Sequence, residues 1–276
     1  MGKIIAFANQ KGGVGKTTTC INVSASMALM GKKVLLIDID PQGNASSGVG
    51  VKKTTDMKSI YNLITGDATL DQVLQHTSVE NLDILPANID LAGVEVEMVY
   101  MENRERILKN LLSSVKDSYD FITIDCPPSL GLLTINALTG ADSVLIPIQC
   151  EFFALEGLSQ LMNTIRLVKK SKLNPDIAIE GVLLTMKDNR SSLGQQVTDE
   201  IKKYFSNYVF ETCIPRNIRL AEAPSHGLAI YQYDKKCVGA KAYVQLAEEL
   251  MTKNNVKFNR LTVRRTKWRT KVWVEG

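Results

Sequence analysis

Short apolar runs, rich in β-branched residues, recur along the chain and are separated by longer segments of helical pattern. Within each run consecutive positions are apolar, so both faces of the segment would be buried. This pattern is typical of strands in a parallel sheet that is covered on both sides. Strands are predicted at 3–8, 33–39, 82–87, 121–125, 143–148, 179–185 and 209–215.

The segments between these runs favour helices because their length and apolar spacing suit a helix with one buried face, and Gly31 is a typical helix terminator. Helices are predicted at 17–30, 91–115, 155–170, 193–205 and 238–253. Alternating strands and helices predict a three-layer α/β fold, in which a mostly parallel, twisted sheet carries helices on both faces.

The composition narrows the class of protein. The 276 residues, 45% apolar and 22% charged, suffice for one large domain. No run of about 18 uncharged apolar residues predicts a membrane span, and the N-terminus begins with a strand pattern instead of a signal peptide. Five scattered cysteines without a C-x-x-C pair indicate free thiols, not disulfides or a zinc site. We therefore expect a cytoplasmic globular protein.

Basic residues are concentrated at the C-terminus. Eight of the 33 Lys and Arg residues, but only one of the 29 Asp and Glu residues, lie within 253–276. The rest of the chain therefore carries a small negative net charge. Residues 1–252 are predicted to form the folded domain, and 253–276 a flexible basic tail. Its cations and two tryptophans would suit DNA or an anionic membrane surface.

The stretch ANQKGGVGKTTT, residues 8–19, joins the first predicted strand to the first predicted helix. Glycines in this context allow backbone N–H groups to surround a phosphate at a helix N-terminus. Lys16 would neutralise the β- and γ-phosphates, and the Thr17 hydroxyl would ligate Mg²⁺. The predicted cradle is Lys11, Gly12, Gly13, Val14, Gly15, Lys16, Thr17 and Thr18. It differs from the usual loop in having Gln10 at the first glycine position and a second lysine, Lys11.

Three aspartates follow predicted strands. Asp125 ends the run FITID and would lie at the carboxyl edge of the sheet, where it could hold Mg²⁺ through water. Asp38 and Asp40, in LLIDIDPQGN, share one face of an extended segment. Asp40 lies further out and could orient an attacking water, whereas Asp38 could position the loop. Both could instead be simple turn formers.

Five segments resemble the ParA/Soj chromosome-partitioning ATPases of the deviant Walker A superfamily, which also includes MinD. They are KGGVGKTT, DIDPQGN, IDCPPSLGLLTINAL, CEFFALEGLSQL and IPRNIRLAEAPSHG. The resemblance covers residues 1–252. It implies a P-loop NTPase fold and an ATPase that uses ATP and Mg²⁺. It also implies a homodimer when ATP is bound, non-specific binding to double-stranded DNA on the nucleoid, and hydrolysis stimulated by a ParB/Spo0J-like partner.

The resemblance also implies roles for particular residues. Lys16 would act on the nucleotide of its own subunit, and Lys11 on that of the other subunit. The ATP phosphates would lie in the loop Lys11–Thr18, with Mg²⁺ on Thr17 supported by Asp125. Asp40 would position or activate the attacking water. Pro215 and Asn217, in IPRN, match the segment that contacts adenine.

DNA contacts are expected from cations, because non-specific binding neutralises phosphates and does not read bases. Arg190 and Arg219 match positions where the family places DNA-contacting arginines. Composition alone adds four lysines as candidates, with a solvated charged face as the alternative reading: Lys202, Lys203, Lys235 and Lys236.

Two other functions use the same loop. A MinD-like membrane switch would need a C-terminal amphipathic helix, and the tail lacks a sustained helical period, so membrane binding is not favoured. A small-molecule enzyme such as an amidoligase, or an iron–sulfur reductase, is the third possibility. The reductase would need cysteine ligands that bridge two subunits, and Cys126 is badly placed for that role because it directly follows Asp125.

Overall fold

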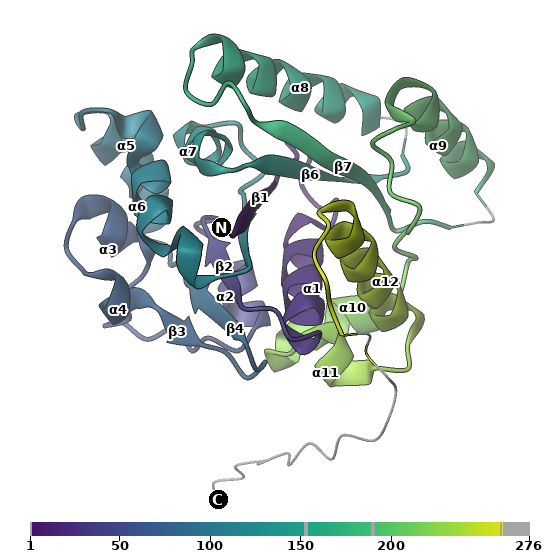
Figure 1. Ribbon diagram of the computed structural model, residues 1–276, viewed down its shortest axis with the longest axis horizontal. Coiled ribbons are helices and arrows are strands. Elements are labelled where there is room, and N and C mark those ends of the chain that lie inside the picture. Colours follow the sequence, from purple (N-terminus) through teal and green to yellow (C-terminus); the bar gives the residue numbers. More distant parts are fainter. Residues whose placement is uncertain (1, 152–153, 189–190, 260, 262–276) are drawn as a thin grey trace, which may run out of the picture.

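The computed structural model describes residues 2–151, 154–188, 191–259 and 261, and its centre is a seven-stranded sheet (Figure 1). The strands are β1 (Lys3–Phe7), β2 (Val34–Asp38), β3 (Gln75–His76), β4 (Leu82–Leu85), β5 (Phe121–Asp125), β6 (Ser143–Gln149) and β7 (Ala178–Thr185). Six of the seven predicted strands are confirmed. The short edge strand β3 was not predicted.

The strand order is β3-β4-β2-β5-β1-β6-β7, and only the β3–β4 pair is antiparallel. Because the other strands are parallel, their carboxyl ends meet at one edge of the sheet. The register places Asp125 of β5 beside Phe7 of β1 and beside Asp38 of β2. The sheet order thus brings the loop after β1 next to two of the three predicted aspartates.

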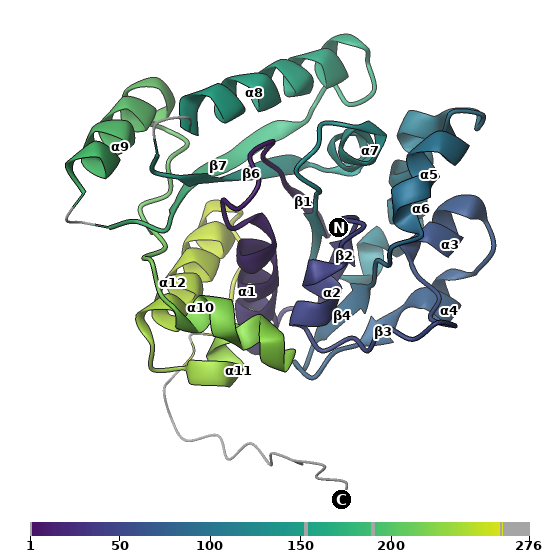
Figure 2. The ribbon, with the colours of Figure 1, turned by 180° about the vertical axis from the view of Figure 1, so that it is seen from behind.

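Helices cover both faces of the sheet, which confirms the three-layer α/β prediction (Figures 1 and 2). One face carries α1 (Lys16–Leu29), α11 (Ile230–Asp234) and α12 (Val238–Lys253). The other carries α3 (Ile60–Thr65), α5 (Leu91–Met98), α6 (Ile107–Val115), α7 (Leu132–Gly140), α8 (Ala154–Lys170) and α9 (Ser192–Phe205). Short helices α2 (Asn44–Gly48), α4 (Leu70–Val73) and α10 (Arg219–Glu222) complete the described α-helices.

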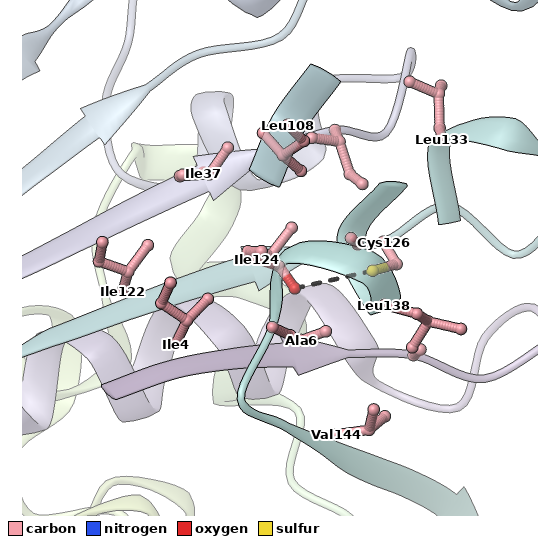
Figure 3. Close-up of a cluster of buried hydrophobic side chains, with 14 of the residues drawn as sticks. Ile4, Ala6, Ile37, Leu108, Ile122, Ile124, Cys126, Leu133, Leu138 and Val144 are labelled. Carbon is pink, nitrogen blue, oxygen red and sulfur yellow. Dashed lines mark hydrogen bonds between the residues drawn. The ribbon is translucent and has the colours of Figure 1, made fainter. Parts of the chain in front are cut away.

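Alternate side chains of β1 enter the two halves of the core. Ile4 and Ala6 belong to the cluster under α6 and α7, whereas Ile5 and Phe7 face α1 and α12; all four are almost fully buried. A side-chain period of two places successive residues on opposite faces, so a strand between two helical layers must be apolar throughout. Figure 3 shows the first cluster, with residues from four strands packed against Leu108, Leu133 and Leu138.

The helix predicted at 91–115 is wrong as a single element. It is interrupted after Met98 and resumes, through the 3-10 turn Arg104–Arg106, at Ile107. Asn103 adopts a left-handed backbone with φ of 52°, which ends helical continuity and which asparagine tolerates better than most residues. The other four predicted helices are confirmed as α1, α8, α9 and α12, each within one residue at either end.

The strand predicted at 209–215 is also wrong, because the segment makes only two isolated bridges: Val209 pairs with Val182 of β7, and Pro215 pairs with Lys187 beyond the end of that strand. Between them the backbone N–H groups of Glu211 and Thr212 donate to the Glu249 carboxylate of α12, at 2.7 and 3.0 Å. The Phe210 ring packs where Gly181 lacks a side chain; a Cβ there would lie 2.4 Å from the ring. The segment is thus held by a few backbone hydrogen bonds near its ends and by side chains between them, not by a continuous ladder.

The first residues after α12 pack on the body. Val256, Phe258 and Leu261 are partly buried against the core cluster that contains α1 and α12, and the Asn259 N–H donates to the Met30 carbonyl at 3.4 Å. Residues 260 and 262–276, which make up most of the predicted flexible tail, lie outside the described residues. The division at residue 252 therefore stays a prediction.

Candidate nucleotide-binding site

The loop between β1 and α1 has the backbone conformation that its glycines predict. Gly13 and Gly15 have φ of 75° and 82°, a region that residues with a Cβ rarely adopt. No atom lies within 4 Å of the positions where Cβ atoms would stand on Gly12 and Gly13. The loop therefore presents bare backbone to open space at the N-terminus of α1, where N–H groups and the helix dipole favour an anion.

Two side chains hold the loop in place. Buried Asn9 donates to the Pro147 carbonyl at 2.8 Å and accepts from the Lys11 N–H at 3.0 Å, which ties the loop to β6. Thr185, the last residue of β7, donates to the Val14 carbonyl at 2.8 Å. Neither residue was singled out from the sequence. Asn9 adjoins the loop and could have been suspected, but Thr185 is distant along the chain.

The two loop lysines occupy different surroundings. Lys16 is buried beneath the loop, and its ammonium donates to the Lys11 carbonyl at 3.2 Å. Burial lowers the pKa of Lys16, although the Asp125 charge opposes that shift. The Lys11 side chain, 29% exposed, reaches instead to the rim of the loop, where its ammonium lies 2.9 Å from the Glu151 carboxylate. Lys16 is thus placed under the cradle and Lys11 beside it.

Asp125 fits the chemistry of a magnesium site. It is fully buried, and neither of its carboxylate oxygens has a hydrogen-bond partner among the described residues. Burial raises its pKa well above the usual range, the charges of Asp38 and Asp40 add to the rise, and the nearby Thr17 and Lys16 side chains oppose it. A buried carboxylate without partners is costly. A divalent cation held by Asp125 and the Thr17 hydroxyl would remove that cost.

Asp38 anchors the loop that carries Asp40. Its carboxylate accepts from the Ser46 N–H at 2.8 Å, from the Ser46 hydroxyl at 2.7 Å and from the Asp40 N–H at 3.1 Å. Burial raises the pKa of Asp38 to about 6 despite these bonds. Asp40 is almost as buried, and its carboxylate accepts from the Gln42 N–H at 3.0 Å. Asp38 therefore stabilises the conformation of the loop after β2. Asp40 lies at the carboxyl edge of the sheet, close enough to Lys16 for their charges to interact.

A largely apolar cavity of about 370 Å³ adjoins the loop and contains both residues predicted to contact adenine, Pro215 and Asn217. Gly15 and Thr18 of the phosphate loop and α1 also line it. The other lining residues include Thr185, Met186, Ile214, Ile218, Leu220 and Tyr243. A larger cavity of about 770 Å³, between segment 207–212 and α12, contains none of the predicted site residues.

Among the described residues, the predicted DNA-binding cations lie on separate segments. Exposed Arg219 pairs with Glu222 at 2.8 Å and lies 4.0 Å from Asp234, while Arg190 lies outside the described residues. The candidate lysines are exposed on two segments that α12 separates in both views (Figures 1 and 2): Lys202 and Lys203 on α9, and Lys235 and Lys236 after α11.

Three observations in the described part of the chain concern the alternative functions. Burial raises the pKa of the Cys126 thiol, which donates to the Ile124 carbonyl at 3.9 Å and lies in the core cluster (Figure 3). No group of three or more His, Cys, Asp or Glu side chains there is arranged to hold a metal ion. A phosphate-loop magnesium site needs fewer protein ligands, because nucleotide and water supply the rest. No described helix is long and apolar enough to cross a bilayer.

Comparison with known proteins gives the family. A family model described as an AAA domain matches residues 2–179. The sporulation initiation inhibitor protein Soj of Bacillus subtilis (strain 168) is 59% identical over 250 residues, covering 91% of this chain and 98% of that protein. The chromosome-partitioning ATPase Soj of Treponema pallidum (strain Nichols) is 52% identical over 254 residues, covering 92% and 99%. The chain belongs to the ParA/Soj family of chromosome-partitioning ATPases.

The fold agrees with this assignment. Cobyrinic acid a,c-diamide synthase from Mycobacterium smegmatis, solved with bound ADP and magnesium, superposes with a TM-score of 0.81 at 35% identity. The match covers 95% of this chain and 100% of that one. The predicted P-loop NTPase fold and the ParA/Soj resemblance are both confirmed.

Proposed function

We propose that this chromosome-partitioning ATPase is a nucleotide-dependent dimer switch. In its ATP state it would bind DNA without sequence preference, and a ParB/Spo0J-like partner would stimulate hydrolysis and release it from the nucleoid. The identity to Soj proteins supports this function over that of a small-molecule ligase, because the relatives named as partitioning proteins are far more similar in sequence than the diamide synthase.

Hydrolysis by this family uses ATP and Mg²⁺, and each part of the site suits that reaction. The bare backbone of Gly12–Gly15 would receive the phosphates, and Pro215 and Asn217 would receive the base. Asp125 and Thr17 would hold Mg²⁺, which neutralises part of the triphosphate charge. Asp40 at the edge of the sheet would orient the attacking water, and Lys16 would stabilise charge that develops on the phosphates.

The position of Lys11 carries the dimer proposal. Its ammonium lies outside the cradle and pairs with Glu151 of the same chain, so within one subunit only Lys16 lies under the phosphate loop. A triphosphate with Mg²⁺ keeps excess negative charge, and a second cation would be needed as more charge develops in the transition state. Lys11 from a facing subunit would supply it, which would make dimerisation depend on ATP.

The test compares two lysine variants. Lys11→Ala should bind ATP with near-normal affinity but remain monomeric and lose hydrolysis, because the cation for the other subunit is missing. Lys16→Ala should fail to bind nucleotide at all, since it loses the cation beneath the loop. Nucleotide affinity, light scattering with ATP, ADP or no nucleotide, and ATP turnover are the measurements.

One result would remove the shared site from the proposal: a Lys11→Ala protein that dimerises and hydrolyses ATP as the wild type does. Glu151→Gln is the matched control, because it releases Lys11 from its intramolecular ion pair without removing the lysine. It should keep ATP-dependent dimerisation.

A further inference from the structure

Exposed apolar side chains are concentrated at one place on the described surface. Of the large hydrophobic residues that are exposed, four lie within twelve residues of each other, in and beside α5: Ile89, Val96, Val99 and Tyr100. Their exposed fractions range from 53% for Val99 to 88% for Tyr100. Single exposed apolar residues are normal in a soluble protein, but a contiguous group is typical of an interaction surface.

The group arises because α5 is apolar on two sides. Leu91, Val94 and Met98 are fully buried against the core. Val96 is exposed on α5 itself, and Ile89 and Tyr100 are exposed in the turns just before and just after the helix. Exposed apolar residues on the outward side of a helix that is already buried on its inner side offer a surface for a partner. Here α5 lies at the periphery of the molecule in both views, beyond α6 (Figures 1 and 2). We define Ile89, Val96, Val99 and Tyr100 as the α5 surface.

The charges around the α5 surface are mainly acidic. The basic side chain beside it, Arg104, donates to the Val99 carbonyl at 3.1 Å and pairs with Glu105. Asp90, Glu97 and Glu102 are exposed, and the segment 89–103 contains no lysine or arginine. Glu97 accepts a hydrogen bond of 3.2 Å from the Tyr61 hydroxyl of α3, which keeps that carboxylate at the rim of the surface. An apolar centre with an acidic rim complements a partner segment that carries apolar and basic side chains together.

The inner side of the same helix contacts the loop that follows Asp125. Glu95 accepts from the Leu133 N–H at 3.0 Å and so satisfies an unpaired donor in the first turn of α7. The Glu95 carboxylate also packs against Gly131, where a Cβ would lie 2.5 Å from its oxygen. Residues 126–131 are therefore held between Asp125, at the end of β5, and the carboxylate of α5.

We propose that the α5 surface is the docking site of the protein that stimulates hydrolysis, and that this partner presents an apolar segment with lysine or arginine side chains. The proposal rests on the function proposed above. Glu95 is a positioning residue: a partner seated on α5 shifts the helix, and Glu95 transmits that shift to the loop beside the magnesium-binding aspartate. The α5 surface would thus connect partner binding to the chemistry.

The test uses the purified full-length protein and the purified Spo0J-type protein from the same organism. The variant Val96→Ser/Tyr100→Ser should raise the partner concentration for half-maximal stimulation by about tenfold or more, since an exposed aromatic is a typical anchor of an interface. Unstimulated ATP turnover and ATP-dependent dimerisation should stay within about twofold of wild type, because neither residue lies in the nucleotide site. The matched control is Leu167→Ser/Tyr204→Ser, two equally exposed apolar residues on α8 and α9.

The role of Glu95 is tested separately. Glu95→Ala should leave the half-maximal partner concentration unchanged but lower the maximal stimulated rate, because the partner still binds while the loop is no longer held. Glu95→Gln keeps an acceptor for the Leu133 N–H and should restore most of the rate. A merely structural role would lower stability and unstimulated turnover together, which chemical denaturation would reveal.

Three results would count against the proposal. Normal stimulation of the Val96→Ser/Tyr100→Ser protein would show that the partner binds elsewhere. Loss of ATP-dependent dimerisation in that variant would show that a second copy of the chain covers α5. If the wild type itself is not stimulated by the Spo0J-type protein, the proposed function fails, and the docking proposal fails with it.

Discussion

Two neighbouring aspartates illustrate how contacts decide the role of a residue. Asp38 and Asp125 end adjacent strands in register, and both are fully buried. Asp38 accepts three hydrogen bonds from the loop after β2, whereas the Asp125 oxygens have no partner among the described residues. Hydrogen bonds to a carboxylate stabilise its charged form. The protein itself supplies the hydrogen-bond donors for the Asp38 carboxylate. The Asp125 carboxylate remains available to bind a cation.

The pKa of Asp38 predicts a dependence of stability on pH. Since burial raises it from 3.8 to about 6, the folded state binds the proton more tightly than the unfolded state. This stabilising contribution is complete below pH 4 and is lost as pH rises through about 6. We compare the free energy of unfolding of the metal-free wild type with that of Asp38→Asn. The difference, wild type minus variant, should fall by about 1 to 3 kcal/mol as pH rises from 4 through about 6.

Urea denaturation at a series of pH values, with a chelator present, measures this difference. Asp40→Asn is the control, because the same strand end is changed without removing the anchor of the loop. A wild-type and Asp38→Asn difference that does not vary between pH 4 and 7 would contradict the prediction.

At the scale of elements, side chains replace a sheet ladder where the local pattern favours a strand. Segment 209–215 has strand-like composition, yet it forms isolated bridges only at its two ends, and Glu249 of α12 accepts from two of its N–H groups. The segment leads directly into Pro215 and Asn217 at the apolar cavity. Helix α12 therefore supports one wall of the predicted base site.

Glu249→Ala should destabilise the protein by about 1 to 2 kcal/mol, because two N–H groups lose a charged acceptor. It should also weaken nucleotide binding modestly, since the support of the cavity wall is loosened. Urea denaturation and nucleotide titration measure the two effects. The neighbouring Glu248→Ala serves as the control; equal effects of both substitutions would show that only the charge of α12 matters.

The element predictions succeeded where local pattern and burial agree. Helix α12 has the predicted bounds, 238–253, because one face packs on the core along its whole length. The prediction for 91–115 failed because the apolar pattern continues through a chain reversal. Asn103 has a left-handed backbone there, and no local apolar spacing records such a turn.

On the scale of the whole molecule, the groups of the nucleotide site are gathered, whereas the described candidate DNA-binding cations are dispersed. The phosphate loop, the aspartates and the apolar cavity meet at the carboxyl edge of the sheet, while those cations are spread over α9, α10 and the segment after α11. The body carries a small negative net charge. DNA binding by such a molecule needs several separate cations on one assembled surface, which a dimer would supply more readily than a monomer.

We therefore predict that the protein co-sediments with duplex DNA of arbitrary sequence in ATP but not in ADP. Arg219→Ala should weaken this binding and reduce the slope of log K against log salt by about 0.9 for each phosphate that the variant no longer neutralises. Arg166→Ala on α8 is the control. Equal DNA binding in ATP and ADP would contradict the link between nucleotide state and DNA.

The local sequence pattern was sufficient to predict strand β1, the phosphate loop with its two lysines, helix α1 and most of the other apolar strands. The backbone conformation of glycines, the start of a helix and the periodicity of buried positions each depend on a few neighbouring residues. They can therefore be predicted from the sequence alone. The tertiary structure alone decided which strands are neighbours and hence which residues meet. The hydrogen bonds of Lys11 with Glu151 and of Val14 with Thr185 join residues 140 and 171 positions apart. Such pairings follow from sheet order, which no local pattern encodes.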